Sequence, residues 1–364
     1  MAIRDETRML LESMSRLFED HCTKQVADAA ETGVFAQSLW DQVAETGVPL
    51  AALPESAGGA DAEWSDLFAA LRVAARYSAP IPLAETMLAG WAAAACGLET
   101  RDGPMTVGPV RSADNLTLER DGNGWRLSGV ATRLPYASHA TRTVLIADGP
   151  DGEMVVALDG PRGGCGGATL TKGKNIANES RDTLTFANVR LSADQAAPVS
   201  GGVSRRALYQ RGALARATMM SGALEKAMDL AVNYAQERVQ FGRPISKFQA
   251  VQQNLAVLAG QTAAAVAAAN LGIEALSDPD PDRQEFLIAI AKTRVGEAAT
   301  LACEIAHQVH GAIGFTKEYA LQLSTRRLWS WREEFGGDPE WAARVGAYAC
   351  RRGASDLWPM LTDG

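Results

Sequence analysis

The chain has 364 residues, of which 47% are hydrophobic and 21% are charged, and its formal net charge is −8 at pH 7. This length and composition predict a globular protein of about two or three domains and exclude a disordered chain. The acidic balance, with no long basic run, argues against nucleic acid or an anionic membrane surface as a partner. A local basic cluster can still hold an anionic ligand such as a CoA ester or a dinucleotide.

Residues 1–100 have the pattern of an N-terminal helical domain. Apolar side chains from Met9 to Phe18 recur at the spacing of one helix face, and later runs repeat that spacing. Pro- and Gly-containing breaks separate the runs. The predicted helices cover residues 9–18, 39–48, 64–76 and 84–95.

Residues 101–200 change to short alternating runs, which predict strands. Asp121-Gly-Asn-Gly124 and Gly149-Pro-Asp-Gly152 have the composition of hairpin turns, because Asn and Gly tolerate positive φ. The pattern predicts a small antiparallel, β-barrel-like middle domain, with a glycine-rich loop at 160–167. The expected strands are at 116–119, 125–127, 143–146, 154–158 and 183–186.

Residues 201–364 are helical in pattern again. Long candidate helices with short connections predict an antiparallel four-helix bundle. Ser246-Lys-Phe-Gln249 has the S-x-x-Q form of a capping box that would open the second helix. The fold class is therefore multidomain α+β. The expected helices of this domain are 205–237, 246–276, 283–310, 317–333 and a shorter one at 339–352.

The cysteines are scattered and odd in number, which favours reduced thiols and a cytoplasmic location. The start of the chain lacks the apolar segment of a signal peptide. The most apolar window is Ala-dominated and interrupted, so no membrane insertion is expected. His307 and His310 have a spacing that suits a metal, but no further ligands accompany them, and no metal is expected. The cysteines are Cys22, Cys96, Cys165, Cys303 and Cys350.

Two segments between long helices carry a family resemblance. The first is Glu237-Arg-Val-Gln-Phe-Gly-Arg-Pro-Ile245, followed by Phe248-Gln249. The second, about 70 residues later, is Gln308-Val-His-Gly-Ala-Ile-Gly-Phe-Thr316. With the helix–strand–helix order of the domains, they resemble the acyl-CoA dehydrogenase family over nearly the whole chain. Within that family, the chain resembles the short, mixed-tetramer type that handles steroid or bulky acyl-CoA.

The resemblance implies FAD at a dimer interface, where the bundle turns of one subunit hold the pyrophosphate and adenine of its neighbour's cofactor. An arginine fork matches a pyrophosphate, and glycines allow close backbone approach. Each residue also has a plainer interpretation, as a helix-end charge, a capping residue or a helix break. The residues implied to bind FAD are Arg238, Phe241, Gln249, Gln308, Gly311 and Gly314.

The middle domain departs from the family pattern. Family members usually carry Thr-Glu-Pro-x-x-Gly-Ser-Asp before the first hairpin, where it contacts the flavin ring and the thioester. Here the corresponding segment is Pro104-Met-Thr-Val-Gly-Pro109, and its Gly-Ser-Asp part is missing. A later family strand is matched only loosely by Leu134-Pro-Tyr-Ala-Ser138.

The family reaction needs a carboxylate base, usually about twenty residues after the Gly-Phe of the second segment. Counting from Phe315 reaches Phe335, so Glu334 is the first candidate and Glu333 the second. Gly336-Gly337 favours unwinding of the helix there. The alternative family position falls on Gly212, which cannot act as a base. Both glutamates could instead be solvent-facing charges paired with Arg326 or Arg332.

The resemblance implies an FAD-dependent α,β-dehydrogenation of an acyl-CoA thioester in fatty acid or steroid catabolism. Electrons would pass to an electron-transfer flavoprotein, and the assembly would be a homo- or hetero-tetramer, a dimer of dimers. The departures leave open a non-catalytic or half-site subunit of a heteromeric dehydrogenase. A helical-bundle interaction protein without a cofactor is a third interpretation, against which both segments argue.

Overall fold

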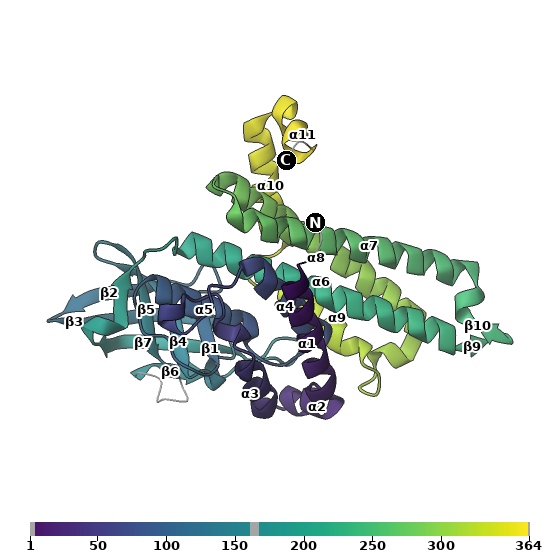
Figure 1. Ribbon diagram of the computed structural model, residues 1–364, viewed down its shortest axis with the longest axis horizontal. Helices are drawn as coiled ribbons and strands as arrows, with labels where there is room; N and C mark the ends of the chain where they lie inside the picture. The colour runs from purple at the N-terminus through teal and green to yellow at the C-terminus, as the bar shows by residue number, and fades with distance from the viewer. Residues whose placement is uncertain (1–3, 161–166, 363–364) are drawn as a thin grey trace. The chain divides into compact units, whose positions relative to one another are not determined.

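The protein is described here by a computed structural model that covers residues 4–160 and 167–362 (Figure 1). The chain forms two compact units, residues 1–215 and 216–364. The first unit contains the N-terminal helices and the large sheet, and the second contains most of α6 and the helices after it. The expected domain limits at residues 100 and 200 stay a prediction. Most of the expected glycine-rich loop, residues 161–166 with Cys165, lies outside the described residues.

The N-terminal helices pack through apolar faces, as the sequence predicts. α4 coincides with the expected helix at 64–76, and α5 begins within one residue of its expected start. α1 buries Met14 and Phe18 on the face that carries the apolar stripe. The helices are α1 (Asp5–His21), α2 (Lys24–Glu31), α3 (Gln37–Glu45), α4 (Trp64–Arg76), α5 (Leu83–Ala95) and the start of α6 (Arg205–Glu237), with 3₁₀ turns at Val48–Leu50 and Glu55–Ala57.

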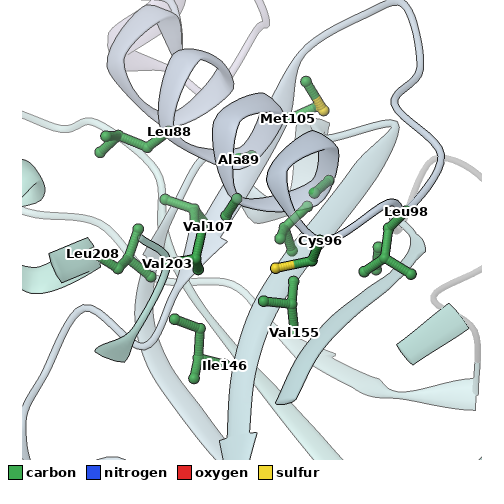
Figure 2. Close-up of a cluster of buried hydrophobic side chains, with 14 residues drawn as sticks. Leu88, Ala89, Cys96, Leu98, Met105, Val107, Ile146, Val155, Val203 and Leu208 are labelled. Atoms are coloured by element: carbon green, nitrogen blue, oxygen red, sulfur yellow. The ribbon is translucent and has the colours of Figure 1, made fainter. Parts of the chain in front are cut away.

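Helix α5 is the centre of the first unit. Apart from Glu85 and Thr86 its side chains are apolar or absent, and a helix of that composition is stable only when buried. One side lies on the sheet, where side chains from three regions of the chain interlock (Figure 2). Full burial of each Leu, Ile, Val or Met stabilises the unit by about 1.5–3 kcal/mol. The residues labelled in the cluster are Leu88, Ala89, Cys96, Leu98, Met105, Val107, Ile146, Val155, Val203 and Leu208.

The middle of the chain forms one mixed sheet in the order β6-β7-β3-β2-β4-β5-β8, with β1 beside β4. Both predicted turns close hairpins, at Asp121–Gly124 and Gly149–Gly152. The expectation of a purely antiparallel domain is wrong, because β1 and β2 both run parallel to β4. The strands are β1 (Met105–Gly108), β2 (Leu116–Asp121), β3 (Gly124–Pro135), β4 (Arg142–Gly149), β5 (Gly152–Asp159), β6 (Thr169–Thr171), β7 (Arg181–Leu191) and β8 (Ala196–Pro198).

The second unit is a helical bundle in which α7 runs beside α8, and a small hairpin joins α6 to α7 (Figure 1). The long helices appear within a few residues of their predicted limits. The predicted capping box is wrong: α7 starts at Gln249 after a 3₁₀ turn, and no side chain caps it. The elements are β9 (Val239–Gln240), β10 (Arg243–Pro244), α7 (Gln249–Glu274), α8 (Pro281–His310), α9 (Leu321–Arg332), α10 (Asp338–Arg352) and α11 (Ala354–Thr362), with 3₁₀ turns η7 (Ile245–Lys247), η8 (Ala275–Ser277) and η9 (Gly311–Phe315).

Helix α7 carries an apolar surface that this chain leaves largely uncovered. The segment Gln249–Ser277 has an 18-residue window with a mean hydropathy of 1.5, of which 28% is buried. By length and composition alone it passes a test for a membrane span, which core helices of soluble proteins also pass. Val257 and Leu271 are 47% and 37% exposed. An apolar face of this kind marks a surface that another protein chain can cover.

Candidate active site

Glu334 is held in the interior of the second unit by an arginine. The Nε of Arg216 in α6 donates to Oε2 of Glu334 at 2.6 Å. Arg216 is 1% exposed and Glu334 8% exposed, so the two charges have been taken out of water together. The guanidinium favours the ionised, proton-accepting form of the carboxylate. A buried carboxylate in this state has the chemistry of a general base.

A break between two helices places Glu334 in this position. α9 ends at Arg332, and α10 begins at Asp338. Phe335 and Gly336 have φ values of 52° and 91°, in the left-handed region that a helix cannot continue through. The expected unwinding before Gly336-Gly337 is therefore confirmed. We call residues 333–337 the glutamate turn.

The two predicted glutamates have different environments. Glu333 is exposed, whereas Glu334 is buried. The alternative in which Glu334 is a solvent-facing charge paired with Arg326 or Arg332 is wrong: Glu334 pairs with Arg216, and Arg332 binds Asp338 at 2.5 Å. Side-chain position thus favours Glu334 as the reactive carboxylate, and its catalytic role stays a prediction.

The first resemblance segment forms a two-residue hairpin at the end of α6. β9 and β10 pair around Phe241 and Gly242, whose φ values of 50° and 78° match the turn that such hairpins require. Phe241 is 92% exposed, and its ring makes a T-shaped contact with the ring of Phe248, with centroids 6.1 Å apart. Arg238 and Gln249 are exposed as well. The hairpin and the first residue of α7 thus leave a cation, a flat ring and an amide exposed.

The second segment forms the end of α8 and the 3₁₀ turn η9. Gln308 and Gly311 are exposed, and Gly311 has φ of 63° with nothing within 4 Å of the position that a Cβ would take. Gly314 differs, because a Cβ there would lie 3.0 Å from Cβ of His310 and 3.1 Å from Nδ1 of His307. Gly311 therefore leaves room for a ligand, whereas internal packing already explains Gly314.

Aromatic contacts bring the two segments to the same end of the bundle. Tyr234, in the last turn of α6, stacks on His310 with ring centroids 4.6 Å apart, and Tyr319 packs against both rings. Burial lowers the pKa of His310 and of His307, which favours the neutral form of both imidazoles. Within residues 4–160 and 167–362, no group of three or more His, Cys, Asp or Glu side chains is arranged to hold a metal ion.

These residues fit the cofactor that the resemblance implies. The exposed guanidinium of Arg238 and the amides of Gln249 and Gln308 supply donors of the kind that a pyrophosphate and an adenine accept. The open space beside Gly311 permits close backbone approach. Phe241 offers a ring face. The predicted residues are thus accessible in one region, apart from the buried Gly314.

The segment that departs from the family pattern is a core strand. Met105–Gly108 forms β1, which is buried throughout and pairs with β4. Thr106 carries the hydroxyl of this strand and donates it to the carbonyl oxygen of Pro135 at 2.7 Å. This hydroxyl is therefore committed to the protein interior.

Sequence reasoning missed two buried cations of the second unit, Arg216 and Lys292. Lys292 is 0% exposed, and burial lowers its pKa to about 8, against the opposing effect of carboxylates that include Asp338 and Glu334. One signal could have found both: each is a single charge in an apolar run, Ala213-Leu-Ala-Arg216-Ala and Ile288-Ala-Ile-Ala-Lys292. Such charges are almost never fully buried unless they are paired.

Comparison with known proteins decides the family. Residues 4–101 match the acyl-CoA dehydrogenase N-terminal domain, and residues 203–338 match the acyl-CoA dehydrogenase C-terminal domain. The chain belongs to the acyl-CoA dehydrogenase family. It is therefore an oxidoreductase of the class that acts on the CH–CH bond of acyl-CoA, and the predicted fold, with helical N- and C-terminal regions around a sheet, is confirmed.

This acyl-CoA dehydrogenase has relatives of similar length. It is 27% identical over 327 residues to acyl-CoA dehydrogenase IpdE2 of Mycolicibacterium smegmatis. The aligned region covers 89% of this chain and 92% of the relative. A variant of the Tcur3481-Tcur3483 steroid ACAD superposes with a TM-score of 0.84 at 26% identity, covering 95% of this chain and 98% of that chain. The ChsE4-ChsE5 complex of Mycobacterium tuberculosis, at 21% identity, shares the fold with a TM-score of 0.87 over 97% and 99% of the chains.

Proposed function

We propose that the chain catalyses FAD-dependent α,β-dehydrogenation of an acyl-CoA thioester, with Glu334 as the general base. The observation that carries this proposal is the buried ion pair of Glu334 with Arg216 beside a helix break. Bound FAD would supply the acceptor for the β-hydride. Glu334 takes the α-proton, and Arg216 holds its carboxylate in a defined orientation and ionised before the transfer.

The exposed surface at the end of the bundle is proposed to hold FAD. Arg238 would pair with the pyrophosphate, and Gln249 and Gln308 would donate to polar atoms of the cofactor. Phe241 would cover an apolar ring face, and the backbone at Gly311 would approach the cofactor. A projecting ring that is 92% exposed suits a contact across a subunit interface better than a contact within its own chain.

An oligomer, either a homo- or a hetero-tetramer, accompanies this proposal. The uncovered apolar side of α7, with Val257 and Leu271 exposed, supports it. Similarity to the Tcur3481-Tcur3483 steroid ACAD, at 26% identity, favours a steroid or otherwise bulky acyl group and a mixed assembly. The transfer of electrons to an electron-transfer flavoprotein and the cytoplasmic location belong to the same proposal.

Spectroscopy and turnover of the purified chain test the proposed activity. The chain is reconstituted with FAD, and acyl-CoA esters, including bulky ring-bearing ones, are added anaerobically. We expect an acyl-CoA substrate to reduce the bound FAD, which bleaches the flavin absorbance. With an artificial electron acceptor present, the chain should then form the 2-enoyl-CoA over repeated turnovers. A chain that binds FAD but reduces it with no ester of the series, even after mixing with a partner subunit, would contradict the proposal.

A half-site subunit is the second candidate, and one observation favours it. The segment where the family usually has Gly-Ser-Asp is a buried strand, with Thr106 bonded inward. In this case the chain would contribute its proposed FAD-binding residues to the cofactor of a partner subunit. It would itself lack part of the contacts to the flavin ring. Activity that appears only when the chain is co-expressed with a second, longer homologue supports this candidate. A fully active pure homotetramer would exclude it.

A further inference from the structure

One face of α8 contacts the residues on either side of the glutamate turn. Lys292, Gly296 and Thr300 lie four residues apart on this helix, so they share one side of it. Each touches the end of α9 or the start of α10. We call these three residues the α8 platform.

Lys292 holds the end of α9. Its Nζ donates to the backbone carbonyl oxygens of Trp331 at 3.4 Å and Arg332 at 2.5 Å. The last carbonyls of a helix have no partner within the helix, and a cation there also interacts favourably with the negative end of the helix dipole. Because these two residues directly precede Glu333 and Glu334, Lys292 fixes where α9 stops and where the glutamate turn starts.

The other two platform residues hold the far side of the turn. Arg332 donates through Nη1 to the hydroxyl of Thr300 at 2.9 Å and through Nε to Oδ2 of Asp338 at 2.5 Å. Gly296 leaves room for that carboxylate, since a Cβ on Gly296 would lie 1.9 Å from Oδ1 of Asp338. The first residue of α10 is thereby tied to the last residue of α9.

The carbonyl groups at the end of α9 account for a lysine at position 292. Lys292 is 0% exposed, and desolvation of an ammonium is costly. An apolar residue would avoid that cost but would leave the carbonyls of Trp331 and Arg332 without this donor. The charges around the ammonium are the carboxylates of Asp338, Glu334 and Glu333 and the guanidinium of Arg216. The lysine thus holds the turn through hydrogen bonds to the two carbonyls and through electrostatic attraction to the three carboxylates.

We propose that Lys292 is a positioning residue for the reaction, which orients Glu334 by anchoring the glutamate turn to the α8 platform. This inference rests on the proposed role of Glu334 as base. Lys292 acts through the backbone that carries the glutamate, and Arg216 aligns the carboxylate itself. A displacement of the base by about 1 Å is enough to lower a rate about 100-fold.

The test compares Lys292→Met, which keeps the length of the side chain, with Val295→Ala. Val295 is a fully buried residue of the same helix, and none of the turn contacts described above involves it. Both FAD-loaded variants are assayed for flavin content, kcat and KM. We expect Lys292→Met to keep its FAD and a KM within about threefold of wild type, while its kcat falls about 10–100-fold. Val295→Ala should lose thermal stability but keep its kcat.

Hydrogen exchange of residues 331–341 provides a measurement that does not depend on activity. We expect the amides of the glutamate turn to exchange at least about tenfold faster in Lys292→Met, and to be unchanged in Val295→Ala. Gly296→Ala, which leaves Lys292 intact, should also speed exchange there by displacing Asp338. Unchanged exchange in Lys292→Met overturns the proposal, as does an unchanged kcat. If the wild-type chain has no turnover even after mixing with a partner subunit, the proposed function fails, and exchange alone decides whether Lys292 anchors the turn.

Discussion

Nε of Arg216 lies 2.6 Å from Oε2 of Glu334, although 118 residues separate the two in the chain. Both side chains are buried, so each carries the cost of desolvation and depends on the other to offset it. The pair connects α6 to the turn that follows α9. It is therefore at once a structural link of the second unit and the proposed location of the base.

Replacement of Glu334 by Gln separates catalysis from binding. Gln keeps the size of the side chain and can still accept from Arg216, but it cannot take a proton. We expect kcat for acyl-CoA oxidation to fall at least about 1,000-fold with FAD content unchanged. The matched control is Glu333→Gln, at the exposed neighbour, which should keep its activity. A loss of activity only in the control would move the base to Glu333.

Loss of the arginine leaves a buried carboxylate without this cation. We expect Arg216→Met to destabilise the chain by about 3–5 kcal/mol, measured by urea unfolding. The double variant Arg216→Met with Glu334→Leu removes both charges and should recover part of that loss. If the effects of Arg216→Met and Glu334→Leu alone simply add in the double variant, the two side chains are not coupled. Their interpretation as a mutually dependent buried ion pair would then be wrong.

The exposed Arg238 should affect the cofactor and leave folding unchanged. Arg238→Ala removes a cation that we place on the FAD pyrophosphate, and a hydrogen bond to a charged group contributes about 1.5–3 kcal/mol. We expect FAD to bind about 10–100-fold more weakly in a titration of the apoprotein, with thermal unfolding of that apoprotein unchanged. Lys247→Ala, an exposed cation in the same connection, is the control. Equal losses in both variants would indicate a general charge effect.

The exposed ring of Phe241 should contribute to assembly. Phe241→Ser removes an apolar surface that its own chain leaves 92% exposed, so the stability of the monomer should change by less than about 0.5 kcal/mol. If another subunit covers this ring, association weakens. Analytical ultracentrifugation over a concentration series, with FAD present, should show the variant dissociating at higher concentration than wild type. Identical sedimentation would place Phe241 outside the interface.

The burial of Lys292 makes stability depend on pH in a defined direction. Burial lowers its pKa to about 8 from an ordinary value of 10.5, against the carboxylates of Asp338, Glu334 and Glu333. Between these two pH values the unfolded chain holds more protons at this residue than the folded chain, so its contribution to stability rises with pH. Below pH 8 both states hold the proton, and the contribution is constant.

Comparison with Lys292→Met isolates this effect from the other titrating groups. From about pH 7.5 to about pH 9.5, the unfolding free energy of wild type minus that of the variant should increase, by at most about 1.4 kcal/mol per pH unit. Urea unfolding of both proteins at several pH values measures the difference. A difference that is flat, or that falls with pH, would show that Lys292 is not desolvated in the folded protein.

Local sequence was sufficient for most elements of the fold. The helix at residues 64–76, the hairpin turns at Asp121–Gly124 and Gly149–Gly152 and the end of a long helix at Glu237 all appear where expected, because near neighbours in the chain determine them. The parallel neighbours of β4 were missed, since strand order depends on contacts between distant segments. The capping box failed because the chain enters α7 through a 3₁₀ turn, which supplies its own backbone hydrogen bonds.

By itself the sequence indicated the family, through two segments whose residue types suit a phosphate and a close backbone approach, and it offered Glu333 and Glu334 as candidates for the proposed base. Only the tertiary structure separated these two neighbours. A turn with positive φ directs one of them inward, where the guanidinium of Arg216 meets it, and leaves the other in water. The residues that make this choice, Arg216 and Lys292, lie on other helices, so no pattern local to the glutamates contains them. Burial of charge is a property of the folded packing, and the cost of desolvation is what requires these partners to meet.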